Sequence, residues 1–204
     1  MKFSIGAVIL SGAFAASGVS AVEPIRIAVI DPLSSSFANV GESQVREAQL
    51  AVEGINARGG VLGGRMFEIV DFDGKGSPQE SLLALKRAVD QGIRIVNQTS
   101  GSSVAAALID AINKHNVRNP DRTVLYLNTG AVDPALTNDK CSFWHFRFDA
   151  DADMKMIALT DSIAYRRYGK ASVPHQSGLL VRADRIAHGE DPAGEKTAGH
   201  HDCR

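Results

Sequence analysis

The chain has 204 residues, of which 44% are hydrophobic and 22% are charged, and its formal net charge is −1. This is the composition of an ordinary globular protein with enough apolar residues to fill a core. No basic excess points to a nucleic-acid partner. The two cysteines, Cys141 and Cys203, are too few for a disulfide scaffold and lack metal-ligand spacing.

The first 21 residues have the pattern of a secretory signal peptide. Lys2 supplies the positive start, residues 5–16 form a short apolar stretch, and Val19-Ser20-Ala21 offers small residues for cleavage. The apolar stretch is too short to span a membrane, and no later stretch is long enough. We therefore expect a periplasmic protein, not a membrane-spanning one, whose mature chain starts near Val22. An uncleaved anchor is the alternative.

Hydrophobic periodicity predicts strands and helices in alternation. Strands are expected at 25–30, 65–72, 93–97 and 123–128. Helices are expected at 42–58, 78–91, 102–115 and 154–163. The second helix starts with Ser77-Pro78-Gln79-Glu80, which has the form of a capping box with proline at the first helical position. This order predicts an α/β fold, a doubly wound and mostly parallel sheet with helices on both faces.

Four loops follow the carboxyl ends of these strands, where such sheets bind ligands. They are residues 31–37, 72–76, 98–103 and 129–133. Three of the four are rich in Ser, Thr or Gly, and they are expected to converge on one crevice.

The turn at Ser100, Gly101 and Ser102 is the strongest candidate site. It joins a short buried strand to a helix, and it offers hydroxyl groups, free N–H donors and the positive helix end, which suit an anion such as a carboxylate. The alternative is that Ser102 only caps the helix. The second small-residue turn, at Gly130-Ala131, favours ligand contact because it converges on the same edge.

Other chemistry finds no support in the sequence. The first strand is not followed by a dinucleotide-binding glycine motif, there is no Walker sequence, and no nucleophile elbow suggests an enzyme. Asp71-Phe72-Asp73-Gly74 lacks the later ligands of a calcium loop. Asp149, Asp151 and Asp153 are interpreted as helix caps and surface residues. We expect no metal and no cofactor.

Several segments resemble the leucine/isoleucine/valine-binding type of periplasmic binding protein. The most specific is Ile55-Asn56-Ala57-Arg58-Gly59-Gly60-Val61-Leu62-Gly63-Gly64, and residues 33–41, 130–137 and 141–147 are also similar. The resemblance covers residues 25–163. It implies two α/β lobes that close over a small amino acid or related carboxylate, which is then delivered to the membrane permease of an ABC transporter.

The resemblance also implies which residues touch the ligand. The two turns would hold its α-carboxylate, and family members often place an aromatic residue near position 40 against its side chain. The implied contacts in this chain are Ser100, Gly101, Ser102, Gly130, Ala131, Val132, Phe37 and Val40.

The character of the chain changes near Tyr165. Residues 165–204 lack apolar periodicity and are rich in Gly, His, Asp and Arg. We expect three parts: a signal peptide at 1–21, a ligand-binding lobe at 22–164, and an aberrant tail at 165–204 in place of a second lobe. A disordered tail is one interpretation, and a frameshift is the other.

The frameshift hypothesis rests on reading the codons of the tail in a shifted frame. With one consistent codon set, residues 173–183 read in the shifted frame give YLINQDYSFG, a strand and polar turn such as would open a second lobe. A bridge between Cys141 and Cys203 should then not be assumed, and His188, His200 and His201 are not ligands. The rival functions are a ligand-sensing receptor module of the same fold and a secreted α/β enzyme.

Overall fold

The computed structural model describes residues 23–168. The expected signal peptide and nearly all of the tail, with Cys203 and the three tail histidines, lie outside the described residues. Cys141 is disulfide-bonded. Within residues 23–168, no helix is long and apolar enough to cross a membrane.

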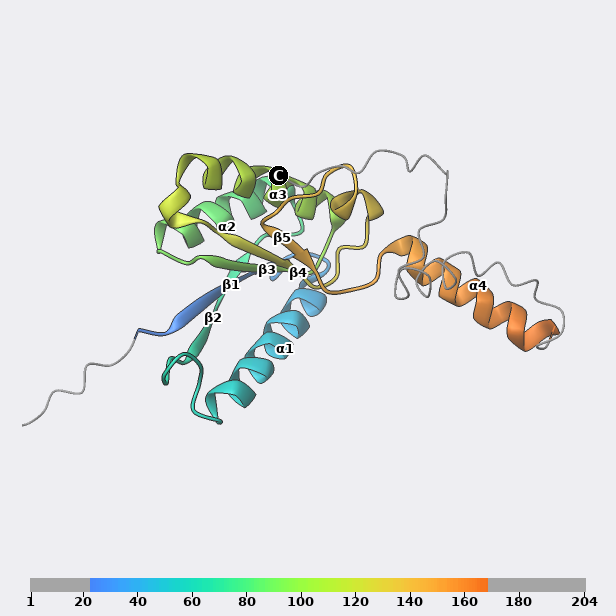
Figure 1. Ribbon diagram of the computed structural model, residues 1–204, viewed down its shortest axis with the longest axis horizontal. Coiled ribbons are helices and arrows are strands. Elements are labelled where there is room, and N and C mark those ends of the chain that lie inside the picture. Colours follow the sequence, from blue (N-terminus) through green and yellow to red (C-terminus); the bar gives the residue numbers. More distant parts are fainter. Residues whose placement is uncertain (1–22, 169–204) are drawn as a thin grey trace, which may run out of the picture.

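A five-stranded parallel sheet forms the centre of the molecule, with the strand order β2-β1-β3-β4-β5 (Figure 1). Its strands are β1 (Ile25–Asp31), β2 (Phe67–Asp73), β3 (Ile95–Gln98), β4 (Leu125–Asn128) and β5 (His145–Arg147). The helices are α1 (Ala38–Asn56), α2 (Pro78–Asp90), α3 (Ser102–Arg118) and α4 (Ala152–Tyr168), with short 3-10 turns η1 (Pro120–Arg122) and η2 (Pro134–Thr137). The predicted α/β fold with a parallel sheet is confirmed.

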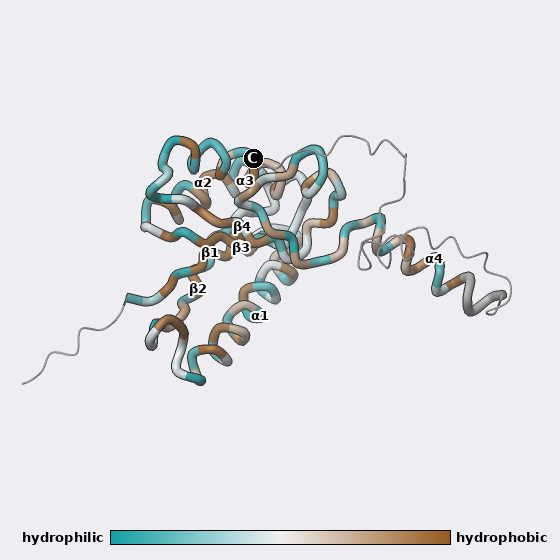
Figure 2. The backbone as a smooth tube through the Cα atoms, in the orientation of Figure 1, coloured by the Kyte–Doolittle hydropathy of each residue, from teal (hydrophilic) through white to brown (hydrophobic). Residues whose placement is uncertain are grey.

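The helices cover the two faces of the sheet unequally. Helices α2 and α3 lie together on one face, whereas α1 packs against β1 and β2 on the other (Figure 1). Figure 2 shows hydrophobic residues concentrated along the strands and alternating with hydrophilic ones along α1. The core lies between the sheet and α2 and α3, and includes Ala28, Ile30, Val96, Tyr126, Leu85, Leu108 and Ile112.

Helix α1 differs from its prediction at both ends. It begins at Ala38, four residues before the expected start, and ends at Asn56. Gly41 is its single buried residue, and the apolar Leu50 is 71% exposed. The reason is that α1 packs on only two strands, so its apolar face is only partly covered.

One further prediction was wrong in detail, and one strand was not predicted. Ser77 does occupy the N-cap of α2, but its hydroxyl bonds the Gln79 side chain at 3.0 Å instead of a helix N–H, so the capping box does not form. Strand β5 was not predicted, because three residues are too few to show periodicity.

Asp149 and Asp151 precede α4 and Asp153 lies in its first turn, so they are caps and surface residues as expected, except that the cap Asp151 is buried. Asp151 accepts a hydrogen bond from the N–H of Met154 at 2.9 Å and pairs with Arg147 at 3.0 Å, and both of these side chains are nearly buried. Asp149 pairs with Lys155, and Asp153 is exposed. Within residues 23–168, no group of three or more His, Cys, Asp or Glu side chains is placed to hold a metal ion.

Candidate functional site

The loops at the carboxyl ends of the strands contact one another, as described below; the crevice expected between them stays a prediction. The hydroxyl groups of Thr99 and Thr129 lie 2.8 Å apart, which joins the loop after β3 to the loop after β4. A Cβ on Gly130 would lie 2.6 Å from the methyl carbon of Thr99, so a glycine is needed where these loops touch. Asp73 accepts a hydrogen bond from the N–H of Leu33 at 2.9 Å, which joins the loops after β1 and β2.

Buried polar side chains from the sheet hold the Thr99–Ser100 turn in place. The carboxylate of Asp31 accepts hydrogen bonds from the N–H groups of Ser100 at 2.9 Å and of Thr99 at 3.3 Å. The amide of Gln98 donates to the carbonyl of Ser100, and the Tyr126 hydroxyl donates to Gln98 at 2.5 Å. Both backbone groups of Ser100 are therefore engaged on the sheet side.

The polar groups that remain available lie at the start of α3. The hydroxyl oxygen of Ser100 is buried and has no hydrogen-bond partner among the described residues. The first N–H groups of α3 have no partner within the helix, as at any helix N-terminus. These groups can donate to an anion.

Ser102 does not cap α3. Gly101, with a φ of 93°, occupies the N-cap position, and Ser102 is the first helical residue. The Ser102 hydroxyl instead accepts a hydrogen bond from the N–H of Asp133 at 3.2 Å. This bond joins the α3 start to the loop after β4.

The loop at 130–132 is shaped by Asn128, the last residue of β4. The Asn128 side-chain oxygen accepts from the N–H groups of Gly130 at 3.1 Å and Ala131 at 2.7 Å, and its nitrogen donates to the Ala131 carbonyl at 3.0 Å. Ala131 is buried, with 2% of its surface exposed. Among the described residues, no partner is recorded for the Gly130 carbonyl or the Val132 N–H.

Phe37 and Val40 lie at the start of α1, and 65% and 40% of their surfaces are exposed. Val40 and Gln44 are one helical turn apart and share a face of α1. The Gln44 side chain accepts a hydrogen bond from the Thr99 hydroxyl at 3.1 Å. Val40 therefore lies on the face of α1 that is directed toward the Thr99–Ser100 turn.

The residues that hold the loops were not predicted from the sequence. Asp31, Gln98 and Asn128 are the last residues of β1, β3 and β4, and each is at most 1% exposed. A signal was present, because a polar residue ends each of these otherwise mostly apolar segments. Periodicity alone does not show that such a side chain turns back under the loop.

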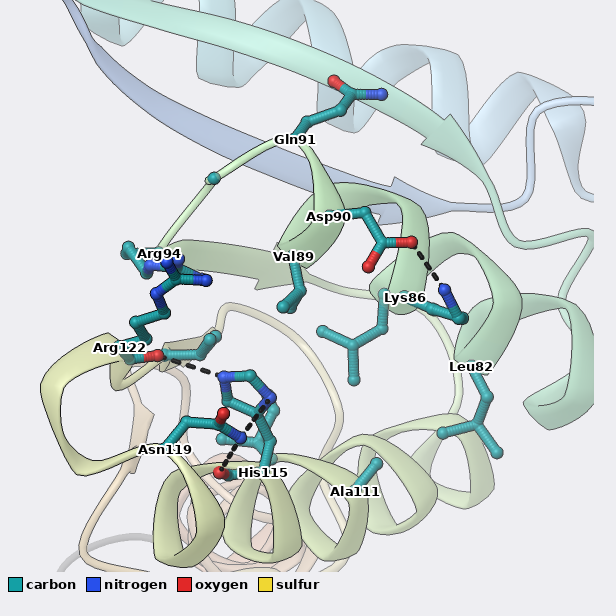
Figure 3. A pocket seen from close by; sticks show the side chains of 14 residues that line it. Leu82, Lys86, Val89, Asp90, Gln91, Arg94, Ala111, His115, Asn119 and Arg122 are labelled. Carbon is teal, nitrogen blue, oxygen red and sulfur yellow. Dashed lines mark hydrogen bonds and ion pairs between the residues drawn. The ribbon is translucent and has the colours of Figure 1, made fainter.

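A cleft among the described residues lies away from these loops. It has a volume of about 830 Å³ and lies between α2 and α3, near the amino ends of β3 and β4 (Figure 3). Lys86 pairs with Asp90 at 2.6 Å in it, and a ring nitrogen of His115 lies 3.0 Å from the Arg122 carbonyl oxygen. None of the predicted ligand residues lines this cleft. It lies at the opposite end of the strands from the candidate site.

Comparisons with known proteins agree with the fold. Residues 24–187 match the periplasmic binding protein family. Leu/Ile/Val-binding protein homolog 4 of Brucella abortus (strain 2308) is 36% identical over 140 residues, which are 69% of this chain and 33% of that protein. The Leu/Ile/Val-binding protein of Escherichia coli (strain K12) is 29% identical over 134 residues, 65% of this chain and 34% of that protein.

Solved structures give the same result. The leucine-, isoleucine-, valine-, threonine- and alanine-binding protein from Brucella ovis, in a closed conformation, is 37% identical with a TM-score of 0.62, over 69% of this chain and 37% of that one. The branched-chain amino acid transporter substrate binding protein LivJ from Streptococcus pneumoniae, in complex with isoleucine, is 27% identical with a TM-score of 0.54, over 63% of this chain and 34% of that one. The chain spans about a third of the length of the curated relatives. It belongs to the periplasmic binding protein family, it is similar to the Leu/Ile/Val-binding proteins of that family, and its described residues form an α/β lobe of that fold.

Proposed function

We propose that the chain is the amino-acid-binding component of an ABC-type uptake system, exported to the periplasm and partnered there by a membrane permease. The ligand is a small amino acid of the branched-chain kind or a related carboxylate. The names of the relatives support this proposal, because they are substrate-binding proteins for such amino acids. We propose no enzymatic activity.

One observation carries the assignment of the site. The Ser100 hydroxyl is buried, has no partner among the described residues, and lies where α3 begins. A buried polar group without a partner costs free energy, and a ligand carboxylate would satisfy it. Further donors would come from the backbone N–H groups of Gly101, Ser102 and their neighbours at the start of α3. The N–H of Val132, in the loop after β4, would be another donor.

The other ends of the ligand have matching groups. The Gly130 carbonyl would accept a hydrogen bond from the ligand ammonium, and Ala131 would pack beneath it. Phe37 and Val40, exposed at the start of α1, would contact an apolar ligand side chain. Because Val40 is smaller than an aromatic residue, this contact would favour a ligand whose side chain reaches Phe37.

The division of the chain remains a proposal as well. We propose a signal peptide at 1–21, a ligand-binding lobe at 22–164 and an aberrant tail at 165–204 caused by a frameshift, with the second lobe not encoded in frame. Sequencing the gene tests this. If no second open frame continues through a lobe-sized segment, the frameshift is refuted.

A ligand titration tests the function. We expect the purified chain to bind leucine, isoleucine or valine weakly, at millimolar concentration, because half of a clamp does not enclose and desolvate its ligand. Amide chemical shifts of residues 99–104 and 130–132 should move during the titration. Micromolar affinity would contradict the weak-binding part, and shifts confined to other regions would contradict the site.

Replacing the Ser100 hydroxyl is the sharper test of the site. Ser100→Ala should reduce affinity about tenfold, since one hydrogen bond to a charged group is worth roughly 1.5 kcal/mol. The control is Ser43→Ala on α1, where the hydroxyl bonds Glu47 at 3.2 Å at an exposed position. If the two variants bind equally well, the Ser100 hydroxyl does not hold the ligand.

A further inference from the structure

Asp31 is a buried carboxylate that no cation balances among the described residues. It is the last residue of β1 and 1% exposed, and none of the ion pairs within residues 23–168 includes it. Burial raises the pKa of Asp31, and the N–H groups and hydroxyl groups of Ser100 and Thr99 oppose that shift. Burying a charge in this way is costly, and an apolar residue would extend β1 at lower cost.

The carboxylate of the neighbouring Asp73 bonds to different loops from the carboxylate of Asp31. Asp73 is opposite Asp31 on β2, but it accepts hydrogen bonds from Leu33, Ser34 and Lys75, in the loops after β1 and β2. Among the described residues, the Asp31 carboxylate accepts hydrogen bonds only from the turn after β3. The two carboxylates therefore hold different loops.

The bonds to Asp31 decide which way the Ser100 peptide faces. Its N–H donates to the carboxylate and its carbonyl accepts from Gln98, so both backbone groups of Ser100 are engaged, whereas its hydroxyl lies near the Asp31 carboxylate and makes no hydrogen bond of ordinary geometry among the described residues. Gly101 follows with a φ of 93° and starts α3. Without Asp31, two buried N–H groups would lose their acceptor and the turn would be free to rotate.

We propose that Asp31 is a positioning residue for ligand binding: by accepting the N–H groups of Thr99 and Ser100, it holds the turn so that the Ser100 hydroxyl and the first N–H groups of α3 face the ligand carboxylate. This inference rests on the proposed function. Asp31 itself is buried and does not touch the ligand. Its side chain acts through the geometry of the turn, and its charge is not required.

Two variants separate geometry from charge. Asp31→Ala removes the acceptor, and Asp31→Asn keeps an oxygen that can accept from both N–H groups, since one oxygen of Asp31 already does so at 2.9 Å and 3.3 Å. The control is Asp71→Asn, which makes the same change of charge at an exposed position of β2. Hydrogen exchange of the Thr99 and Ser100 amides and leucine titration by amide chemical shifts are measured on the whole chain.

The expected pattern is specific. Asp31→Ala should lose protection of the Ser100 amide and at least about tenfold in leucine affinity, a loss equivalent to one hydrogen bond to a charged group. Asp31→Asn and Asp71→Asn should keep both. Should Asp31→Ala fail to fold, Asp31→Asn decides: affinity like that of the unchanged chain supports positioning by geometry, and a tenfold loss overturns it.

The outcomes separate this inference from the proposed function. If the unchanged chain binds leucine, and Asp31→Ala binds it equally well while its Ser100 amide exchanges freely, the positioning role is refuted and the function stands. If Asp31→Ala keeps the protection of that amide, the role is also refuted. If the unchanged chain binds no amino acid of the panel, the proposed function fails, and the positioning role fails with it.

Discussion

Gly41→Ala should destabilise the lobe by about 3 kcal/mol, in the range of strong overpacking. A Cβ at position 41 would lie 2.0 Å from the carbonyl oxygen of Pro32 and 2.7 Å from its carbonyl carbon. Both atoms are backbone, so no side-chain rotation relieves the clash. Helix α1 would have to move away from the loop after β1, and with it Phe37, Val40 and Gln44. Urea unfolding measured by circular dichroism gives the change in unfolding free energy.

The same helix supplies the control. Gly54→Ala places a Cβ whose nearest neighbour is the Arg58 guanidinium at 3.9 Å, an ordinary contact. Alanine stabilises a helix interior relative to glycine by up to about 1 kcal/mol. The two glycine-to-alanine changes should therefore shift the urea midpoint in opposite directions. A shift of the same sign and size in both would show that the approach of α1 to Pro32 is not what Gly41 permits.

Gly41 also shows a feature that sequence periodicity does not predict, the start of α1. Its surroundings look like the polar end of a loop, so the periodicity placed the helix start at residue 42, after it. The helix in fact begins at Ala38, so that Gly41 lies inside it against the Pro32 backbone, and contact between backbones leaves no periodic signal. The alternation of strands and helices, by contrast, was predictable because burial against α2 and α3 leaves apolar runs that are visible in the sequence.

The candidate site, like the fold, was predictable only in part: its turns could be predicted from the sequence, and the side chains that hold them could not. Small-residue turns after β3 and β4 can be read directly, and the rule that ligands bind at the carboxyl ends of strands brings them together. The side chains beneath them cannot be read, because Asp31 lies 69 positions before Ser100 in the chain. Side-chain amides make comparable hydrogen bonds to distant backbone groups: Asn56 bonds the Phe67 backbone at 2.8 Å, and Asn116 bonds the Val124 backbone at 2.8 and 2.9 Å. Each depends on a spatial neighbour that local pattern does not identify.

His145 should make the lobe sensitive to mild acid. Burial, together with the charge of Arg147, lowers the pKa of His145 from 6.5 to about 4. The unfolded chain therefore binds a proton on this ring at a higher pH than the folded chain, so stability is lost as the pH falls from 6.5 toward 4. The loss from this residue is on the order of 3 kcal/mol, from the size of the shift.

The loss has a structural reason. The His145 ring packs on Tyr126, with ring centroids 5.0 Å apart, and its Nε2 lies 3.3 Å from the side-chain nitrogen of Asn128. A neutral Nε2 accepts a hydrogen bond from that amide, whereas a protonated ring has no acceptor left. Because Asn128 also holds Gly130 and Ala131, protonation of His145 should loosen the loop as well as destabilise the fold.

His145→Gln isolates this contribution. Burial raises the pKa of Asp31, so that residue favours the folded state more at low pH and opposes His145 above pH 3.8, its ordinary pKa. The slope of the unchanged chain thus combines both groups, and the difference between the two proteins reports His145 alone. Urea unfolding at a series of pH values should show His145→Gln with a smaller stability loss between 6.5 and 4. Parallel curves for the two proteins would mean that His145 takes up its proton equally easily in the folded and the unfolded chain.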